Sequence, residues 1–298
     1  MSIRIGYACI NTLLQSPNRT CRLNRATPDR ILEIAGQNLT ALEEILHWNL
    51  EHHIRLFRIS SEIIPFGSHP VNQEPWWEIH AEALRRIGAL INANGMRVSM
   101  HPGQYTVLNS LRPEVVQASV SELVYHARFL DSLGVDASHK IVLHVGGVFG
   151  DKPASLQRFL ENYQTQPGPT RARLVVENDE KSYSLEDTLT ISAATGVPVV
   201  FDVFHHRWNP SFPALGLRQL VERAAATWGM EDGRPKLHYS DQRPGKPPGA
   251  HSEQVDVEVF GAFLSQVRDL ELDIMLEVKD KEQSVLALQR AFPELAAE

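Results

Sequence analysis

Histidine and carboxylate side chains recur in this chain at the ends of short apolar runs that are rich in β-branched residues. The eight residues at or just past the ends of these runs are Tyr7, Ser60, His101, His144, Glu177, Asp202, His238 and Glu277. The last six all carry nitrogen or oxygen atoms that can bind metal ions. Three carboxylates buried together would repel one another and raise each other's pKa unless cations compensated them. The pattern therefore predicts a site for several divalent ions.

Three further histidines stand near these positions in the sequence. His205 follows Asp202 by three residues, His251 follows His238 by thirteen, and His69 lies in the segment FGSHP. They could hold a further ion or contact a substrate phosphate. The ligand set contains no thiolate, which suits Mn²⁺, Zn²⁺ or Mg²⁺, and the histidines argue against Mg²⁺ alone.

Each of these residues also has a purely structural interpretation. A histidine at a strand end can simply be hydrogen-bonded, Asp202 could cap a helix, and Glu177 in VVENDE could begin a solvated acidic run. The joint pattern favours the metal site. Clustered divalent ions suit phosphoester hydrolysis, because they activate water and stabilise both the attacking and the leaving oxygen. They also suit sugar isomerisation, so the ligands alone leave two classes of enzyme open.

The apolar runs alternate with longer amphipathic stretches that are typical of helices. The predicted strands are residues 3–6, 54–59, 97–100, 140–145, 173–176, 197–201, 236–239 and 273–278. Eight strands, each followed by a helix, predict an α/β fold, a single (β/α)₈ TIM barrel over residues 1–298. The strand-end residues would then converge on the C-terminal face, where barrel active sites lie. A doubly wound open sheet is the alternative, but no G-x-G-x-x-G motif follows the first strand.

Composition narrows the class of protein further. Hydrophobic residues make up 43% of the chain, and no stretch approaches the ~20 apolar residues of a membrane helix. The N-terminus does not read as an export signal, and two cysteines make no disulfide framework, so we expect a cytoplasmic monomer without a membrane partner. The net charge of −7 argues mildly against indiscriminate polyanion binding, although basic residues cluster locally, as at Arg243 and Lys246.

The segment SMHPGQYTVLN, residues 99–109, places bulky polar residues where a turn needs only small ones. His101 is followed by Pro102 and Gly103, and then by Gln104 and Tyr105. A core-capping histidine followed by an ordinary turn is one interpretation. A metal ligand followed by a functional loop is the other.

A series of short segments runs in order through nearly the whole chain. They are GYACIN, NRTCRL, FRISSEIIPFGSH, MHPGQY, LHVGGVFGDK, VVENDE, FDVFHH, KLHYSD, HSE and LEVKDKE. This ordered set resembles the UV damage endonuclease family, a branch of the endonuclease IV and xylose isomerase-like barrel superfamily. The resemblance implies a metal-dependent DNA repair enzyme. It would nick damaged double-stranded DNA immediately 5′ of UV photoproducts and other distorting lesions, leaving a 3′-hydroxyl.

The resemblance also implies roles for individual residues around three divalent ions, with Mn²⁺ the first choice. The first ion would be held by His101, His144 and a bridging Glu177, the second by Glu177, Asp202, His238 and Glu277, and the third by His205 and His251. Catalytic positions match Glu177, Lys236 and His69, and DNA-probing positions match Tyr7, Asn11, Gln104 and Tyr105. Phe204 is a departure, because some relatives are expected to carry another histidine there.

Several of these residues have a physical interpretation as well. A phenol and a planar amide on a loop stiffened by Pro102 are suited to enter a base stack, so Gln104 and Tyr105 would test how readily a duplex opens. Lys236 should point into the barrel mouth, on the same strand face as His238. Divalent ions there should lower its pKa, and it would either form a carbamate with CO₂ or contact DNA phosphate. We expect Arg243 and Lys246 to contact the phosphates of any duplex.

Two alternatives to a DNA endonuclease stay open. One is a metal-dependent sugar isomerase on the same barrel, and the other is a non-catalytic scaffold that binds lesions. An isomerase would not explain Gln104, Tyr105 or the basic loop. The complete ligand set argues against a scaffold that has lost turnover.

Overall fold

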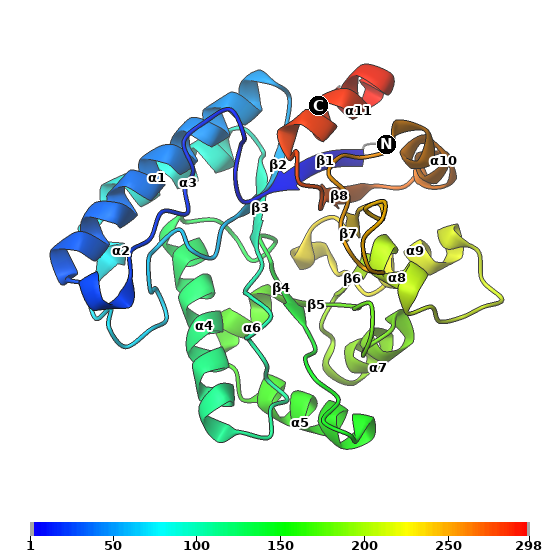
Figure 1. The fold of residues 1–298 in the computed structure, drawn as a ribbon, viewed down its shortest axis with the longest axis horizontal. Coiled ribbons are helices and arrows are strands. Elements are labelled where there is room, and N and C mark those ends of the chain that lie inside the picture. The colour runs from blue at the N-terminus through cyan, green and yellow to red at the C-terminus, as the bar shows by residue number, and fades with distance from the viewer. Residues whose placement is uncertain (1–2, 297–298) are drawn as a thin grey trace.

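The computed structural model describes residues 3–296, which form a closed barrel of eight strands (Figure 1). The strands are β1 (Ile3–Ala8), β2 (Leu56–Ile59), β3 (Arg97–Met100), β4 (Ile141–His144), β5 (Leu174–Glu177), β6 (Val199–Asp202), β7 (Lys236–Tyr239) and β8 (Leu272–Leu276). Each strand pairs in parallel with the next, and β8 pairs with β1 to close the ring. The predicted (β/α)₈ TIM barrel is confirmed. The ends of the predicted domain, residues 1–2 and 297–298, lie outside the described residues.

The bounds of β3 and β7 are those predicted, and the other six strands differ by one or two residues at an end. The difference in β1 matters most. Tyr7 was expected at the end of this strand, but it lies inside the strand because it pairs with Phe57 of β2 and Leu276 of β8. Ala8 packs inside the barrel with Leu56 and Met275. Because side chains alternate along a strand, Tyr7 faces outward, toward the helices.

Helices follow every strand and surround the barrel (Figure 1). They are α1 (Pro28–Glu51), α2 (Trp76–Ile79), α3 (Ala81–Ala93), α4 (Pro113–Ser132), α5 (Lys152–Gln164), α6 (Gly168–Arg173), α7 (Leu185–Thr195), α8 (Val203–Trp208), α9 (Leu217–Ala225), α10 (Val257–Val267) and α11 (Glu282–Ala291). The start of α1 follows from its sequence, since the Thr27 side chain accepts a hydrogen bond from Arg30 N and Pro28 occupies the first turn. Within residues 3–296, every helix is too short or too polar to span a bilayer.

The interior of the barrel is layered from one end to the other. Val142, Val175 and Val200 form an apolar middle layer with Trp228. His144, Glu177 and Asp202 each lie two residues further along the same strands, toward their C-terminal ends. Because side chains alternate along a strand, these three point to the same inner face as the valines. A change from apolar to polar side chains within three adjacent strands thus creates the site at the barrel mouth.

The N-terminal end of the barrel is closed by a buried ionic cluster, which we call the barrel floor. It consists of Arg4 on β1, Arg97 on β3 and Asp273 on β8. Asp273 accepts hydrogen bonds from Arg4 Nε at 2.7 Å and from Arg97 Nη1 at 2.7 Å, and its side chain has no exposed surface. Burial alone would raise the pKa of the Asp273 carboxyl, but Arg97 and Arg4 hold it below its usual range.

Replacing this carboxylate should therefore destabilise the fold strongly. We expect Asp273→Asn to lower the free energy of unfolding by about 3–5 kcal/mol, because two buried guanidinium groups lose their counter-charge. Since folding lowers the pKa of Asp273, its contribution is complete above the unfolded value of about 3.9 and is lost as the pH falls through the lower folded value. Urea titrations at several pH values measure both effects. Arg268→Ala, which breaks the exposed pair with Glu294, is the control and should change stability little.

Candidate metal centre

Parallel pairing brings the predicted ligands side by side at the C-terminal ends of the strands. His144 of β4 lies opposite Glu177 of β5, and Asp202 of β6 lies opposite His238 of β7. His101 directly follows β3, and Glu277 directly follows β8. The barrel therefore brings all six of the predicted strand-end residues together at one end, as the sequence predicts.

Glu177 lies at the centre of this cluster and has no exposed surface. Its Oε1 lies 2.6 Å from His238 Nδ1, and its Oε2 lies 3.0 Å from His101 Nε2. His144 Nε2 is 3.6 Å from the same Oε2. Burial would raise the pKa of Glu177, but the neighbouring histidines, His238 first among them, hold it well below its usual range. Glu177 is thus a carboxylate shared by three imidazole rings.

Asp202 is both a helix cap and a member of the cluster. Its Oδ1 accepts a hydrogen bond from His205 N at 2.7 Å at the start of α8, so the structural interpretation of this residue is also correct. Its Oδ2 lies 3.5 Å from His205 Nδ1. Burial raises the pKa of Asp202 to about 7, and the charges of Glu177 and Glu277 add to this effect. Burial works against a charged His205, but Asp202 raises the pKa of His205 to about 9.

Three groups of side chains bring their ligand atoms within 4.8 Å of one another. The groups are His101–Glu177–His238, Glu177–Asp202–His205, and Asp202–His238–Glu277. They share members, as expected for ions that lie close together with bridging carboxylates. Asp202 Oδ2 and His238 Nε2 are buried, and neither has a hydrogen-bond partner within residues 3–296. Both atoms are free to bind a cation, so these residues fit divalent ions.

The orientation of the histidines supports the same conclusion. In His101 and His251, the ring Nδ1 lies 2.9–3.1 Å from a backbone carbonyl oxygen. A neutral ring that donates from Nδ1 presents a lone pair at Nε2, which is the usual arrangement of metal-binding histidines. Burial lowers the pKa of His101 to about 4, so this ring is neutral. It cannot donate to both Pro102 O and Glu177 Oε2, and a cation between Nε2 and the carboxylate resolves the conflict.

The grouping differs in part from the one that the sequence implied. His238, rather than His144, completes the group with His101 and Glu177. His205 groups with Glu177 and Asp202 rather than with His251, although the His205 and His251 rings are 5.8 Å apart. His251 Nε2 lies 3.9 Å from Glu277 Oε2. Distances across the barrel interior decide which of these side chains come within reach of one another.

Arg58 is a member of the site that the sequence analysis missed. Its guanidinium forms an ion pair with Glu277 Oε1, and both side chains are largely buried. Burial would lower the pKa of Arg58, but the charge of Glu277 raises it above its usual value. Arg58 stands within β2, between apolar neighbours in FRIS, so only its place on the inner strand face marks it as functional.

Lys236 lies on β7, two residues before the predicted ligand His238. Its side chain is buried, and its Nζ has no hydrogen-bond partner within the described part of the chain. Burial lowers its pKa well below the usual range, with Arg97 acting in the same direction and Asp273 opposing it. Arg97 and Asp273 belong to the barrel floor, whereas Arg58 of the candidate metal centre also lowers the pKa of Lys236. Lys236 thus lies on the inner strand face two residues before His238, and its role beside the ions stays a prediction.

Comparison of this chain with known proteins shows the family to which it belongs. The family model described as UV-endonuclease UvdE matches residues 3–297. The chain belongs to this UvdE family. The UV DNA damage endonuclease of Clostridium perfringens (strain 13 / Type A) is 40% identical over 295 residues, which cover 98% of this chain and 71% of that protein. The crystal structure of SacUVDE matches with a TM-score of 0.93 and 43% identity over 98% of this chain and 99% of that one. Endonuclease IV from Thermus thermophilus, with 17% identity over 99% of this chain and 100% of that one and a TM-score of 0.59, shares the fold.

In this UvdE-family chain, the loop after β3 projects the residues predicted to probe DNA. Gln104 and Tyr105 are exposed, Tyr105 by 68% of its surface. The Tyr105 hydroxyl donates to Glu122 Oε1 at 3.3 Å, and Glu122 also accepts from Ser68 in the loop after β2. The Tyr105 ring lies over Gly103, where a Cβ would collide with it. Gly103 therefore permits the position of the phenol.

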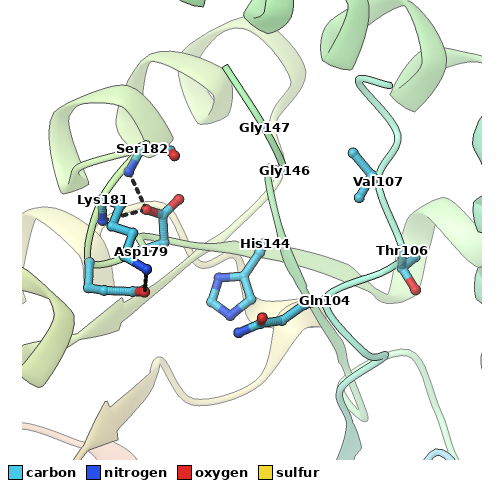
Figure 2. Close-up of a pocket in the computed structure, with 10 residues that line it drawn as sticks. Gln104, Thr106, Val107, His144, Gly146, Gly147, Asp179, Lys181 and Ser182 are labelled. Carbon is cyan, nitrogen blue, oxygen red and sulfur yellow. Dashed lines mark hydrogen bonds and ion pairs between the residues drawn. The ribbon is translucent and has the colours of Figure 1, made fainter. Parts of the chain in front are cut away.

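Gln104 and His144 line a cavity of about 280 Å³ at the barrel mouth (Figure 2). Asp179 and Lys181, from the loop after β5, line its opposite wall. Gly146, with φ of +113°, forms part of the wall beside Asn109 and Val107. The exposed amide of Gln104 thus adjoins a ligand of the candidate metal centre.

Three other residues predicted to act in catalysis or DNA binding lie outside the three ligand groups. Tyr7 is fully buried and donates a hydrogen bond to Asn49 Oδ1 of α1 at 2.6 Å, and Asn11 donates to the Tyr7 hydroxyl at 3.0 Å. Both side chains are buried in this conformation, because the outward face of β1 packs against α1, and their contact with DNA stays a prediction. His69 is exposed and belongs to none of the three ligand groups.

The two basic loop residues differ in their surroundings. Lys246 is exposed after β7, whereas Arg243 forms an ion pair with Glu253 at 2.5 Å. Lys246 is therefore more available than Arg243 to contact a phosphate.

Metal content should follow from this geometry. We expect protein purified without chelator and reconstituted with Mn²⁺ to contain three divalent ions per chain by elemental analysis. Bound ions relieve the repulsion among the carboxylates, so Mn²⁺ should raise the melting temperature and a chelator should lower it. Asp202→Asn should reduce the ion content, because Asp202 belongs to two of the ligand groups. Glu161→Gln, on the exposed face of α5, should leave the content unchanged. Fewer than two ions in the unaltered protein would contradict a multi-ion centre.

Proposed function

We propose that this protein is a metal-dependent UV DNA damage endonuclease. It cleaves double-stranded DNA immediately 5′ of UV photoproducts and other distorting lesions and leaves a 3′-hydroxyl. The observation that carries the proposal is the ligand cluster around Glu177 beside the exposed Gln104 on the same face of the barrel. Membership of the UvdE family and the names of its relatives support it.

The ligand cluster would hold three divalent ions, with Mn²⁺ as the favoured metal. The residues that would hold them are His101, His144, Glu177, Asp202, His205, His238, His251 and Glu277. When bound, the ions would supply Lewis-acid activation of water and of the scissile phosphodiester. Glu177 would bridge two ions and so set the distance between them. All of these ligands come from one chain, which suits a monomer.

The surrounding residues divide into those that select a lesion and those that bind any duplex. Gln104 and Tyr105 would enter the base stack, where unstacking costs a few kcal/mol and less at a lesion. Lys246, with Arg243 once it leaves Glu253, would contact phosphates without regard to sequence. Lys236 would act from beneath the ligands, as a carbamate or as a buried amine, and affect cleavage more than binding. His69, which is exposed in the loop after β2, would contact the substrate.

The proposal is tested by incubating UV-irradiated, abasic, nicked and intact duplexes with the protein and Mn²⁺. A nick 5′ of the lesion, with an end that a polymerase extends, is expected only in damaged DNA. Binding to damaged DNA without cleavage would instead support a lesion-binding scaffold. Inactivity on every duplex, with turnover of a sugar, would support an isomerase.

Removal of the central charge should abolish cleavage. We expect Glu177→Gln to lose nicking by a factor of about 10³ or more, because both ions that it joins lose a charged ligand. Its melting temperature without metal should be close to that of the unaltered protein. Near-normal activity in Glu177→Gln would contradict the bridging role. Glu161→Gln serves as the matched control.

Removal of the probing side chains should change selectivity rather than metal binding. The double variant Gln104→Ala, Tyr105→Ala should bind damaged and intact duplexes nearly equally, with unchanged metal content. Lys246→Ala should instead weaken all duplexes alike and reduce the slope of log K against log salt concentration by about one. Full lesion preference in the double variant would show that the loop does not probe the stack.

A further inference from the structure

Lys281 has a backbone conformation that side-chain-bearing residues rarely adopt. It connects β8 to α11, and its φ and ψ are +55° and −116°. A positive φ with this ψ is favourable for glycine but strained for any residue with a Cβ. Lys281 occupies the N-cap of α11, yet its side chain makes no capping hydrogen bond. The start of the helix therefore does not require a lysine here.

Lys281 lies at the C-terminal end of the barrel, in the loop between β8 and α11, four residues beyond the predicted ligand Glu277. The side chain is half-buried, and within residues 3–296 its ammonium makes no ion pair. Burial lowers the pKa of Lys281, although Glu277 and Asp280 act against this. Lys281 is thus a partly desolvated amine without a partner in contact.

Neighbouring contacts hold this segment rigidly against the loop after β1. Glu282, which has no exposed surface, accepts hydrogen bonds from Thr12 N at 2.9 Å and from the Thr12 hydroxyl. In the same loop, Cys9 also has a positive φ, of +72°, and Cys9 N donates to Arg58 O at 2.7 Å. The strained lysine therefore does not belong to a loose loop. It lies between two anchored elements, at the place where β1 and β8 adjoin (Figure 1).

We propose that Lys281 is a substrate-binding residue of the cleavage reaction, whose ammonium binds a non-bridging oxygen of the scissile phosphodiester. The inference rests on the proposed function, since the anion that reaches this position in a DNA-cleaving enzyme is a phosphate. The Lys281 ammonium makes no ion pair within residues 3–296, and it would gain an anionic partner when DNA binds. The strained backbone is then explained by function, because an unstrained conformation would direct the side chain elsewhere. Lys279 shows the contrast, since it is exposed and its Nζ lies 3.7 Å from Glu253.

Two substitutions separate the role of the charge from that of the backbone. Lys281→Met keeps most of the side chain and removes the charge, and we expect kcat on lesion DNA to fall by about 10²-fold or more. Lys281→Gly removes the charge and also the strain. It should melt at a higher temperature than the unaltered protein and yet lose as much activity. Lys279→Met is the matched control and should stay within about threefold, because an exposed ion pair contributes little.

Metal content distinguishes phosphate binding from an indirect effect on Glu277. Both Lys281 variants should retain the full complement of Mn²⁺ by elemental analysis. Activity of Lys281→Met within about threefold of the unaltered protein, comparable to the exposed control, would overturn the proposal. Loss of activity together with loss of Mn²⁺ would also overturn it, because Lys281 would then support the ligands rather than the substrate. If the unaltered protein failed to cleave damaged DNA, the proposed function itself would fail instead.

Discussion

The repulsion among Glu177, Asp202 and Glu277 is the constraint around which the barrel mouth is organised. Three carboxylates in a buried site are unfavourable unless positive charge lies close to each of them. Imidazole rings and the Arg58 guanidinium supply part of this charge without metal. The pKa of Asp202, raised to about 7, shows that the compensation is incomplete. Divalent ions would supply the rest of the positive charge, and Asp202 Oδ2 and His238 Nε2, which have no hydrogen-bond partner within residues 3–296, indicate where the ions would bind.

The two ends of the barrel handle buried charge in opposite ways. At the barrel floor, two arginines at hydrogen-bond distance match the charge of Asp273. At the mouth, Asp202 Oδ2 and His238 Nε2 have no hydrogen-bond partner within residues 3–296, and Lys281 has a strained backbone. Complete pairing stabilises a fold, whereas incomplete pairing leaves binding capacity for ions and substrate. The separation allows the same barrel to be stable at one end and reactive at the other.

Loops at the mouth add a second kind of surface around the ligands. Leu13, Tyr105, Phe149 and Trp208 are exposed in or beside the segments that follow β1, β3, β4 and β6. Exposed apolar and aromatic side chains that ring a polar centre are suited to bases that leave a distorted stack. Glu122 connects the loop after β3, through Tyr105, to the loop after β2, through Ser68, so the positions of these two loops are coupled. In the proposed function, lesion selection and catalysis would share one face.

Pattern and spacing along the chain were enough to predict the barrel, the order of its strands and the residues at the strand ends. Short apolar runs separated by amphipathic stretches are compatible with few other folds, and a barrel must bring His101, Glu177 and Glu277 to one face. The direction and depth of individual side chains came only from the three-dimensional packing. Tyr7 faces α1, Lys236 lies a layer below His238, and Arg58 meets Glu277 across the interior. These facts depend on strand register and on distances across the closed barrel, which join residues far apart in the chain. No local pattern encodes them.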